Sequence, residues 1–390
     1  MERYGGAAVR LRIEASFRAL PSLIHPAPGH DPITLMFHAR PALGASAGTF
    51  RFDSTLRSRI HFHSWVQAKA MTIERARPHT VSKTWGIADL RPWSDARQDD
   101  GPIGEIWYER PGDATPNSSL LLKLLFTSQP LSIQVHPDDA SAHAMGLPNG
   151  KTEAWYVLST TPDAKVALGL KQRLTSQQFR AAVGDGTIRD LVVWHSVSAD
   201  DVISVPAGTI HSIGAGIIIA EIQQRSDATF RLFDFGRHRA LHIESAIAVA
   251  NTGPADSLVQ PDDLVHERTL LVTNSLFRFE KLTLPANSAW SLGAEQETWF
   301  LVLKGSAHIE SFDIRQGEAI FAQSDHIELC TGPIGLVGLM ACTNSGEIPH
   351  LTRRIGQPGP THARRSPLMQ APSVSPATSI LSNGHLDIAQ

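Results

Sequence analysis

The sequence predicts an all-β protein of two jelly-roll β-barrels with a small helical insertion. Short apolar segments with Gly and Pro at the corners between them recur over residues 119–233, which is typical of a jelly roll or barrel. A second run with the same rhythm follows over about 265–345. Between residues 175 and 195 the apolar spacing changes to that of a helix, which indicates an insertion in the first barrel.

These patterns divide the chain into parts. We expect a poorly ordered or misannotated extension over 1–70, a first barrel over 71–254 with its helical insertion at about 172–195, a second barrel over 255–350, and a disordered tail over 351–390. The extension mixes Arg, Pro and Gly without a sustained period, and the tail is rich in Pro, Ser, Arg and Gln.

The strands are predicted from apolar runs and from alternation of apolar and polar residues. In the first barrel they cover 119–126, 131–136, 153–159, 165–170, 202–205, 211–213, 217–222 and 229–233, with a polar loop over 137–150. In the second barrel they cover 277–284, 298–303, 306–309 and 314–321.

Three helices are expected. Thr175 and Gln178 fit a capping box, and Gly184 and Gly186 follow as a stop signal. A second short helix is predicted over 188–192, and a third, over 239–251, closes the first barrel.

Composition narrows the classes of function. The 390 residues are 42% hydrophobic, and 35 basic residues balance 38 acidic ones, so nothing favours nucleic acid or an anionic membrane surface as a partner. We expect no membrane span and no signal peptide. Cys330 and Cys342 are expected to be buried and reduced. We expect the protein to be cytoplasmic, and to be a monomer or a weak homo-oligomer.

Four residues in three short phrases form a candidate metal site. Gln134 and His136 lie two apart in one predicted strand, so they point to the same face. Glu153 opens another strand, and His211 follows a Pro-Ala-Gly corner. Two imidazoles, a carboxylate and an amide oxygen directed inward are suited to a divalent cation. A set without cysteine and with a weak amide ligand favours catalysis over a structural role.

The phrases around these residues resemble type I phosphomannose isomerases, which are zinc-dependent double cupins. The phrases are 131–139, 150–158 and 205–214, and two more, 85–93 and 227–237, agree in order and spacing. The resemblance runs from about Met71 to about Asn344, and it implies that Met71 is the initiator. It also implies a double cupin, in which each jelly-roll barrel is one cupin.

The implied activity is the interconversion of mannose 6-phosphate and fructose 6-phosphate through an enediol or enediolate. The resemblance assigns Zn²⁺ to the four residues named above and the catalytic cation to Arg231. Lys151, two residues before Glu153, is a catalytic and substrate-binding candidate or else a solvated loop charge. Ser132, on the face of Gln134, is a weaker candidate for binding the sugar phosphate.

Several alternatives stay open. In one alternative, Arg231 pairs with Asp234 or Asp227 instead of acting in catalysis. For Lys123, which lies in an apolar strand, the alternatives are that it reaches the pocket or that it pairs with a carboxylate such as Glu244. The proton-transfer base is a His, a Glu or a metal-bound water. In the second barrel, residues 293–297 lack the His pair of a metal site, so we expect that barrel to be structural and metal-free.

Two positions depart from the family pattern, because Asp200 replaces a Gly at a corner and Phe230 replaces the Tyr before the catalytic Arg. Two rival functions are an iron-dependent cupin oxygenase and a non-catalytic sugar-binding cupin. The oxygenases usually carry His-x-His followed closely by Glu, whereas here Gln134 replaces the first His and Glu153 lies much further on. The complete ligand set and Arg231 argue against the binding protein.

Overall fold

The structure is a computed structural model that describes residues 72–96, 101–111, 118–255, 258–265, 267–310, 312–323, 325–343 and 350–353. All of them belong to one compact unit of the chain, Val66–Gln390. The predicted extension with Met71, and the tail beyond Arg353, lie outside the described residues.

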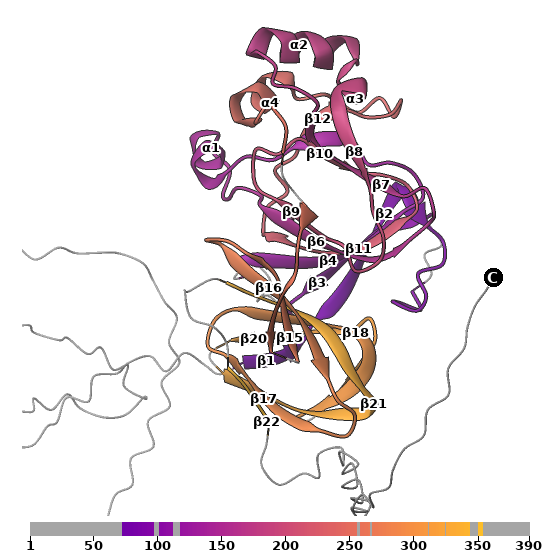
Figure 1. Cartoon of the computed structure of the whole chain (residues 1–390), viewed down its shortest axis with the longest axis vertical. Helices are drawn as coiled ribbons and strands as arrows, with labels where there is room; N and C mark the ends of the chain where they lie inside the picture. The colour runs from indigo at the N-terminus through magenta and orange to yellow at the C-terminus, as the bar shows by residue number, and fades with distance from the viewer. Residues whose placement is uncertain are drawn as a thin grey trace, which may run out of the picture. The chain divides into compact units, whose positions relative to one another are not determined.

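The first barrel packs a seven-stranded sheet against a five-stranded sheet (Figure 1). The larger sheet has the order β13-β9-β6-β11-β4-β3-β2 and the smaller one β12-β5-β10-β7-β8. The strands are β2 (Arg77–Ile87), β3 (Ile103–Glu109), β4 (Leu120–Thr127), β5 (Ile133–Val135), β6 (Glu153–Thr160), β7 (Lys165–Leu170), β8 (Val192–Ser196), β9 (Val202–Val205), β10 (His211–Ile213), β11 (Ile217–Gln224), β12 (Phe230–Phe233) and β13 (Leu258–Val259).

The second barrel is one curved sheet with the main order β1-β20-β18-β21-β16-β15-β14. Its strands are β1 (Thr72–Arg75), β14 (Asp262–Val265), β15 (Arg268–Thr273), β16 (Phe277–Leu284), β17 (Ala289–Ala294), β18 (Thr298–Ile309), β19 (Phe312–Arg315), β20 (Ala319–Gln323), β21 (Asp325–Thr343) and β22 (Leu351–Arg353). The first of these strands comes from the start of the described chain, so the border between the sheets differs from the predicted border between the domains.

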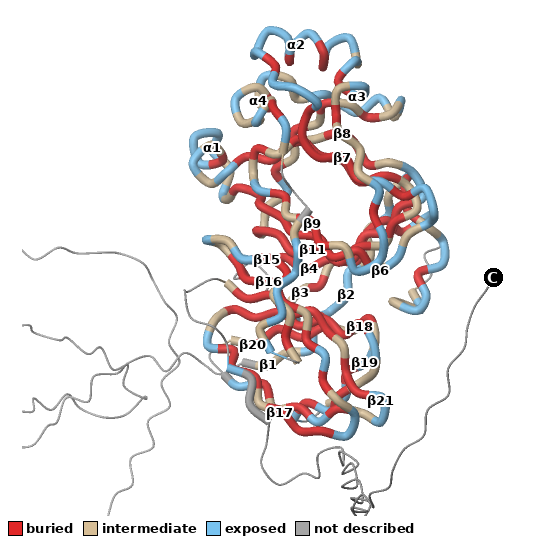
Figure 2. The backbone as a smooth tube through the Cα atoms, in the orientation of Figure 1, coloured by how far each residue is buried: buried red, intermediate tan, exposed pale blue. Residues whose placement is uncertain are grey.

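Strand β4 is buried along its whole length, and the reason explains its continuous apolar sequence (Figure 2). Leu122 and Leu124 pack against Phe277 and Trp299 of the second barrel in one core cluster. Leu125, on the opposite face, packs in the interior of the first barrel. Because side chains alternate along a strand, Lys123 shares the interior face with Leu125.

The helices are α1 (Asp139–Ala144), α2 (Ser176–Asp185), α3 (Ile188–Leu191) and α4 (Ile243–Val249), which gather at one end of the first barrel in Figure 1. The predicted capping box is present: the Gln178 amide donates to Thr175 Oγ1 at 3.2 Å, and Gln178 Oε1 accepts from the Thr175 amide at 2.9 Å. Gly186 ends α2 at a φ of 81°, in the left-handed region.

Three local predictions were wrong. The expected loop over 137–150 contains α1, which Asp138 caps by accepting from the Ser141 amide at 2.7 Å. The expected helical segment ends at Leu191, because the β-branched residues that follow pair as β8 with β7. The closing helix starts at Ile243, four residues later than Arg239, whose side chain binds Asp234 instead.

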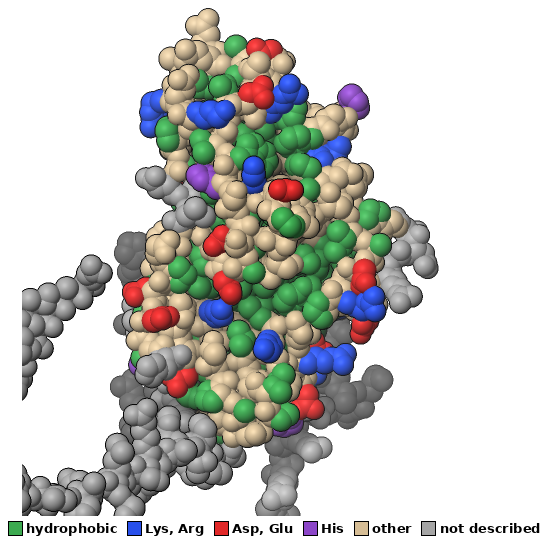
Figure 3. All heavy atoms as spheres, turned by 45° about the vertical axis from the view of Figure 1, so that its right-hand side comes forward, with side chains coloured by type: hydrophobic (Ala, Val, Ile, Leu, Met, Phe, Trp, Pro, Cys, Tyr) green, Lys and Arg blue, Asp and Glu red, His purple; other side chains and the backbone are tan. Residues whose placement is uncertain are grey.

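The remaining predictions concern the cysteines, the C-terminal tail, the surface charge and membrane spans. Cys342 is buried and unpaired, as expected, but Cys330 is exposed. Leu351–Arg353 pairs with β17, so order extends into the predicted tail. On the face shown in Figure 3, acidic and basic side chains are interspersed. Among the described residues, no helix has the length and apolar character needed to cross a membrane.

Candidate active site

A cavity of about 260 Å³ lies in the first barrel and gathers most of the predicted site residues. Its walls come from β2, β3, β4, β6 and β11 of the larger sheet, from β5 and β10 of the smaller one, and from the chain around β12. The polar side chains that line it include Lys83, Glu105, Lys123, Ser132, Gln134, Lys151, Glu153, Glu221, Arg231 and Arg239.

At one wall of the cavity, two imidazoles and a carboxylate converge. The ligand atoms of His136, Glu153 and His211 lie within 4.8 Å of one another, and all three residues are buried. His136 Nε2 is 3.4 Å from Glu153 Oε1, and His211 Nε2 is 3.8 Å from Glu153 Oε2. Among the described residues this is the only group of three or more His, Cys, Asp or Glu with that geometry.

The backbone orients both imidazoles toward the centre of the cluster. His136 Nδ1 lies 2.8 Å from the Ala228 carbonyl oxygen, and His211 Nδ1 lies 2.9 Å from that of Thr209. A carbonyl oxygen can only accept, so each Nδ1 carries the proton and each Nε2 presents its lone pair to the centre. Burial lowers the pKa of both histidines, which keeps the imidazoles neutral and able to bind a cation.

Gln134 reaches the same centre with its amide. Its Nε2 lies 3.5 Å from His136 Nε2 and 3.3 Å from His211 Nε2, while its Oε1 accepts from Ser132 Oγ at 3.0 Å. The nitrogen therefore faces the imidazoles here. The predicted amide-oxygen ligand requires the amide to turn over, which would leave Nε2 to donate to the Ser132 hydroxyl.

Lys151 is buried beside the cluster rather than solvated. Its ammonium donates to Glu153 Oε1, and it lies 3.2 Å from His136 Nε2. Burial raises the pKa of Glu153, but Lys151 and the two histidines together outweigh it and hold that pKa below its usual range. The centre thus has an ionised carboxylate with a displaceable cation next to it.

A second group of charged residues lines the cavity: Lys123, for which one predicted role was to reach the pocket, and Glu221 and Glu105, which were not among the predicted site residues. Lys123 Nζ donates to Gln223 Oε1 at 2.6 Å and to Glu221 Oε1 at 3.2 Å, so its partner is Glu221 and the suggested Glu244 pairs with Arg180 instead. Burial raises the pKa of Glu221. The sequence signal for this pair was a single charged residue inside each of two apolar strands, Lys123 in β4 and Glu221 in β11.

Glu105 extends this group toward β2 and β3. It lies 3.4 Å from Lys83 Nζ, and Trp107 Nε1 donates to its other oxygen at 2.5 Å. The same indole ring lies 5.0 Å from Lys123 Nζ, within the range of a cation–π contact. The cavity wall therefore alternates positive and negative side chains across four neighbouring strands, β2, β3, β4 and β11.

Arg231 lines the cavity and is not paired with Asp234. Asp234 accepts from Arg237 Nε at 3.1 Å and from Arg239 Nε at 2.8 Å. Arg231 Nη1 donates to the Ala240 carbonyl at 2.8 Å, and its buried Nε has no hydrogen-bond partner. Burial lowers the pKa of Arg231, although an arginine stays charged at any working pH.

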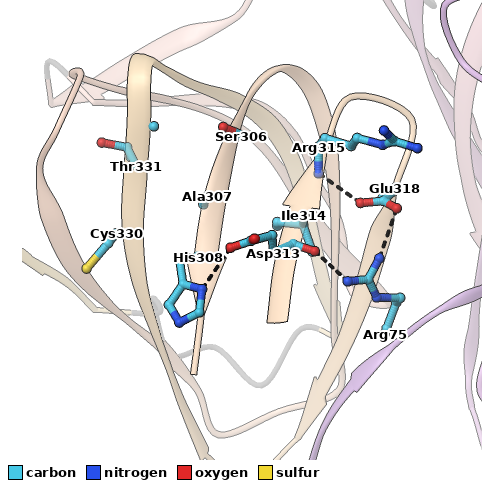
Figure 4. A pocket seen from close by; sticks show the side chains of 11 residues that line it. Arg75, Ser306, Ala307, His308, Asp313, Ile314, Arg315, Glu318, Cys330 and Thr331 are labelled. Carbon is cyan, nitrogen blue, oxygen red and sulfur yellow. Dashed lines mark hydrogen bonds and ion pairs between the residues drawn. The ribbon is translucent and has the colours of Figure 1, made fainter. Parts of the chain in front are cut away.

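A larger hollow of about 750 Å³ lies in the second barrel, beside the β18–β19 hairpin (Figure 4). Its charged side chains bind one another: Arg75 Nη1 lies 2.9 Å from Glu318 Oε1, and His308 Nδ1 lies 2.8 Å from Asp313 Oδ1. His308 and Asp313 are also largely exposed to water, and Arg75 and Glu318 are partly so, which weakens their electrostatic interaction with a ligand. The hollow is therefore the weaker candidate site.

Two jelly-roll barrels, with a buried His-Glu-His centre in one of them, define a cupin whose centre can hold a metal ion. Comparison with known proteins shows which kind of cupin it is. The chain belongs to the mannose-6-phosphate isomerase family, because it is 33% identical to ManA of Bacillus subtilis over 256 residues, 60% of this chain and 76% of that protein.

A second relative supports the same family. The mannose-6-phosphate isomerase of Streptococcus mutans is 36% identical over 214 residues, which are 51% of this chain and 66% of that protein. The matched part of the chain therefore spans just under two thirds of that relative and about three quarters of ManA. No protein-family model matches the chain.

Solved structures confirm the fold. The mannose 6-phosphate isomerase of Bacillus subtilis superposes with a TM-score of 0.60 at 21% identity, covering 69% of this chain and 99% of that one. A mutant form of phosphomannose isomerase from Salmonella typhimurium gives a TM-score of 0.58 at 15% identity, covering 70% and 100%. The predicted double cupin is thereby confirmed.

Proposed function

We propose that this chain interconverts mannose 6-phosphate and fructose 6-phosphate, using Zn²⁺ held by Gln134, His136, Glu153 and His211. The observation that carries the proposal is the convergence of two inward Nε2 atoms and a buried carboxylate on a cavity that also holds Lys and Arg side chains. The names of the relatives supply the substrate and the reaction.

The donor set fits a zinc ion. Neutral imidazole nitrogens and a carboxylate are ordinary zinc ligands, and the cavity beside them leaves room for a substrate oxygen. The ammonium of Lys151 contacts Glu153 and His136, two of the residues that would hold the ion, so it would have to turn toward the cavity if the ion bound. When bound, the metal ion would supply a Lewis acid that stabilises negative charge developing on the sugar oxygens.

The reaction moves a proton between C1 and C2, so it needs a group that takes the proton and cations that stabilise the enediolate. Arg231, with its unpartnered Nε, supplies a guanidinium whose fork spans two oxygens. Lys151 supplies a second donor next to the metal centre. Pre-oriented donors of this kind lower the barrier because they are placed where charge develops.

For proton transfer, Glu221 is the carboxylate that the cavity adds to the sequence-based candidates. It lines the cavity and is not a proposed metal ligand. Because burial raises its pKa toward neutrality, it accepts and returns a proton more readily than an ordinary carboxylate at working pH.

The phosphate group requires cations and hydroxyls. The wall formed by residues 226–239 provides the guanidiniums of Arg231 and Arg239 and the hydroxyl of Thr229. Ser132 is better explained as the partner of the Gln134 amide than as a direct phosphate ligand, because its hydroxyl donates to Gln134 Oε1. The two unpaired cysteines favour a reducing compartment, and we extend the proposal to the cytoplasm.

The test is a coupled assay of mannose 6-phosphate turnover before chelation, after chelation and after adding zinc back. We expect turnover to disappear with the metal and to return with zinc. Arg231→Ala should retain the metal but lower kcat about 10²- to 10³-fold, the usual cost of removing one preorganised donor. Arg180→Ala, an exposed arginine on α2, is the matched control and should leave kcat unchanged.

Absence of turnover in the fully metal-loaded protein would contradict the proposal. Oxygen consumption with iron in place of zinc would then favour the oxygenase, whereas tight sugar-phosphate binding without turnover would favour the binding protein.

A further inference from the structure

Gln223 is fully buried on β11 and does not line the cavity, yet its amide has one orientation. Its Nε2 donates to the carbonyl oxygens of Gln224 and Ser226, each at 2.8 Å. The amide has only two N–H bonds, and both are directed at acceptors. Turning the amide over would bring its oxygen against two carbonyl oxygens, so Oε1 must face the opposite way.

In that direction Oε1 meets Lys123, whose Nζ lies 2.6 Å away. Glu221, on the same face of β11, accepts from the same Nζ at 3.2 Å, and Lys123 and Glu221 are direct partners in the β4–β11 register. An ammonium has three N–H bonds, and Gln223 and Glu221 take two. The third N–H bond remains for another acceptor, and Lys123 lines the cavity.

We propose that Gln223 is a positioning residue that fixes the Lys123 ammonium so that its remaining N–H donates to an oxygen of the sugar phosphate. The inference rests on the proposed function for the identity of the ligand. It assigns Gln223 no contact with substrate: the residue acts through Lys123. A neutral acceptor serves this purpose better than another carboxylate, because Lys123 keeps its positive charge available to an anionic ligand instead of sharing it with a second anion.

A structural role for Gln223 has to be separated from this one. Gln223 also ties down the turn after β11, and the Ala228 carbonyl in that turn orients His136. Loss of the amide therefore has two routes to lower activity: release of Lys123, or disturbance of the metal centre. Metal content and a double-mutant cycle distinguish them.

The experiment compares the metal-loaded wild type, Gln223→Leu, Lys123→Met and the double variant by kcat/KM for mannose 6-phosphate and by bound metal. Gln223→Leu should lower kcat/KM about 10- to 100-fold, the factor for one hydrogen bond to a charged group, with metal retained. In the Lys123→Met background the same change should lower kcat/KM less than about twofold. Thr331→Val, which removes a buried hydroxyl of the second barrel, controls for lost stability and should keep kcat/KM.

An equal loss in both backgrounds, or loss of metal from Gln223→Leu, would overturn the inference, and so would full activity of that variant. The same cycle on the unfolding midpoint without substrate tests the Gln223–Lys123 contact independently of turnover. There we expect a smaller shift from Gln223→Leu once Lys123 is Met, and additive shifts would refute the contact. A wild type that does not isomerise mannose 6-phosphate, with a non-additive unfolding cycle, would reject the proposed function while leaving the contact in place.

Discussion

Glu153 in the first barrel and Glu297 in the second stand at the same local motif, a carboxylate two residues before a buried tryptophan. Trp155 Nε1 donates to Glu153 at 3.2 Å, and Trp299 Nε1 donates to Glu297 at 3.1 Å. Both carboxylates are buried at the start of a strand. The motif is therefore shared, and what differs between the barrels is the remainder of each carboxylate's surroundings.

The other partners of Glu153 are side chains, whereas those of Glu297 are backbone amides. Glu153 faces Lys151, His136 and His211. Glu297 accepts from the Ser119 and Leu120 amides, at 2.6 and 2.8 Å, where β4 of the first barrel begins. A lysine or an imidazole can move or change partner when a cation arrives, but a backbone amide in a strand cannot. One carboxylate is thus open to a ligand, and the other is committed to joining the barrels.

The largest expected effect comes from Glu153→Gln. Removing the one anionic ligand should weaken metal affinity by at least about 100-fold, the upper range for losing a residue that merely supports a ligand, and abolish turnover. Metal content after dialysis, measured by elemental analysis, checks this. Glu297→Gln is the matched control, and equal metal retention by the two variants would erase the proposed difference between the barrels.

A smaller effect is expected from Glu297→Gln itself. A glutamine keeps one acceptor but turns an N–H toward the donors at the start of β4, so the free energy of unfolding should fall by about 1–3 kcal/mol. Chemical denaturation measures it, with Glu295→Gln, an exposed neighbour, as control. The metal content should not change. An unaltered unfolding curve would mean that Glu297 does not anchor β4.

The smallest effect concerns a buried carboxylate held by two arginines, of which Arg239 is the more exposed. Burial raises the pKa of Asp234, but Arg239 and Arg237 outweigh it and leave the pKa below its ordinary value. A carboxylate with a lowered folded-state pKa stabilises the fold above its unfolded pKa and loses that contribution as pH falls. Asp234→Asn should cost about 1 kcal/mol at neutral pH, because Arg239 is partly exposed.

The pH dependence of stability tests whether the contribution of Asp234 is electrostatic. The difference in unfolding free energy between wild type and Asp234→Asn should shrink as the pH falls below about 4, near the ordinary aspartate pKa. Denaturation curves from pH 7 to pH 3 measure this difference. If it stays constant across the series, the contribution of Asp234 is packing rather than charge.

Local signals predicted what depends on local chemistry. The capping box at Thr175 follows from residues three apart, and the strand over 165–170 follows from a short apolar run. The convergence of His136, Glu153 and His211 was predicted from their phrases and their resemblance to a family, and the geometry brings their ligand atoms together.

The partners of Lys123 could not be predicted in the same way. Its pairing with Glu221 depends on the β4–β11 register, which joins segments far apart in the chain. The surroundings of the Gln134 amide have the same origin, since the β5–β10 pairing brings His211 Nε2 to 3.3 Å from Gln134 Nε2. Sequence patterns show that a charge lies in an apolar strand, but not which strand will lie beside it.

Strand β1 has a consequence for the order of folding. Thr72 pairs with Gln323, and only Ala76 separates β1 from β2, which pairs with β3 in the other barrel. During synthesis β1 emerges before the rest of the described chain, yet its partner β20 emerges near the end. Until β20 is made, the backbone groups of β1 have no strand partner. Such non-local pairing forms slowly. The second barrel is thus closed by the earliest part of the core to leave the ribosome.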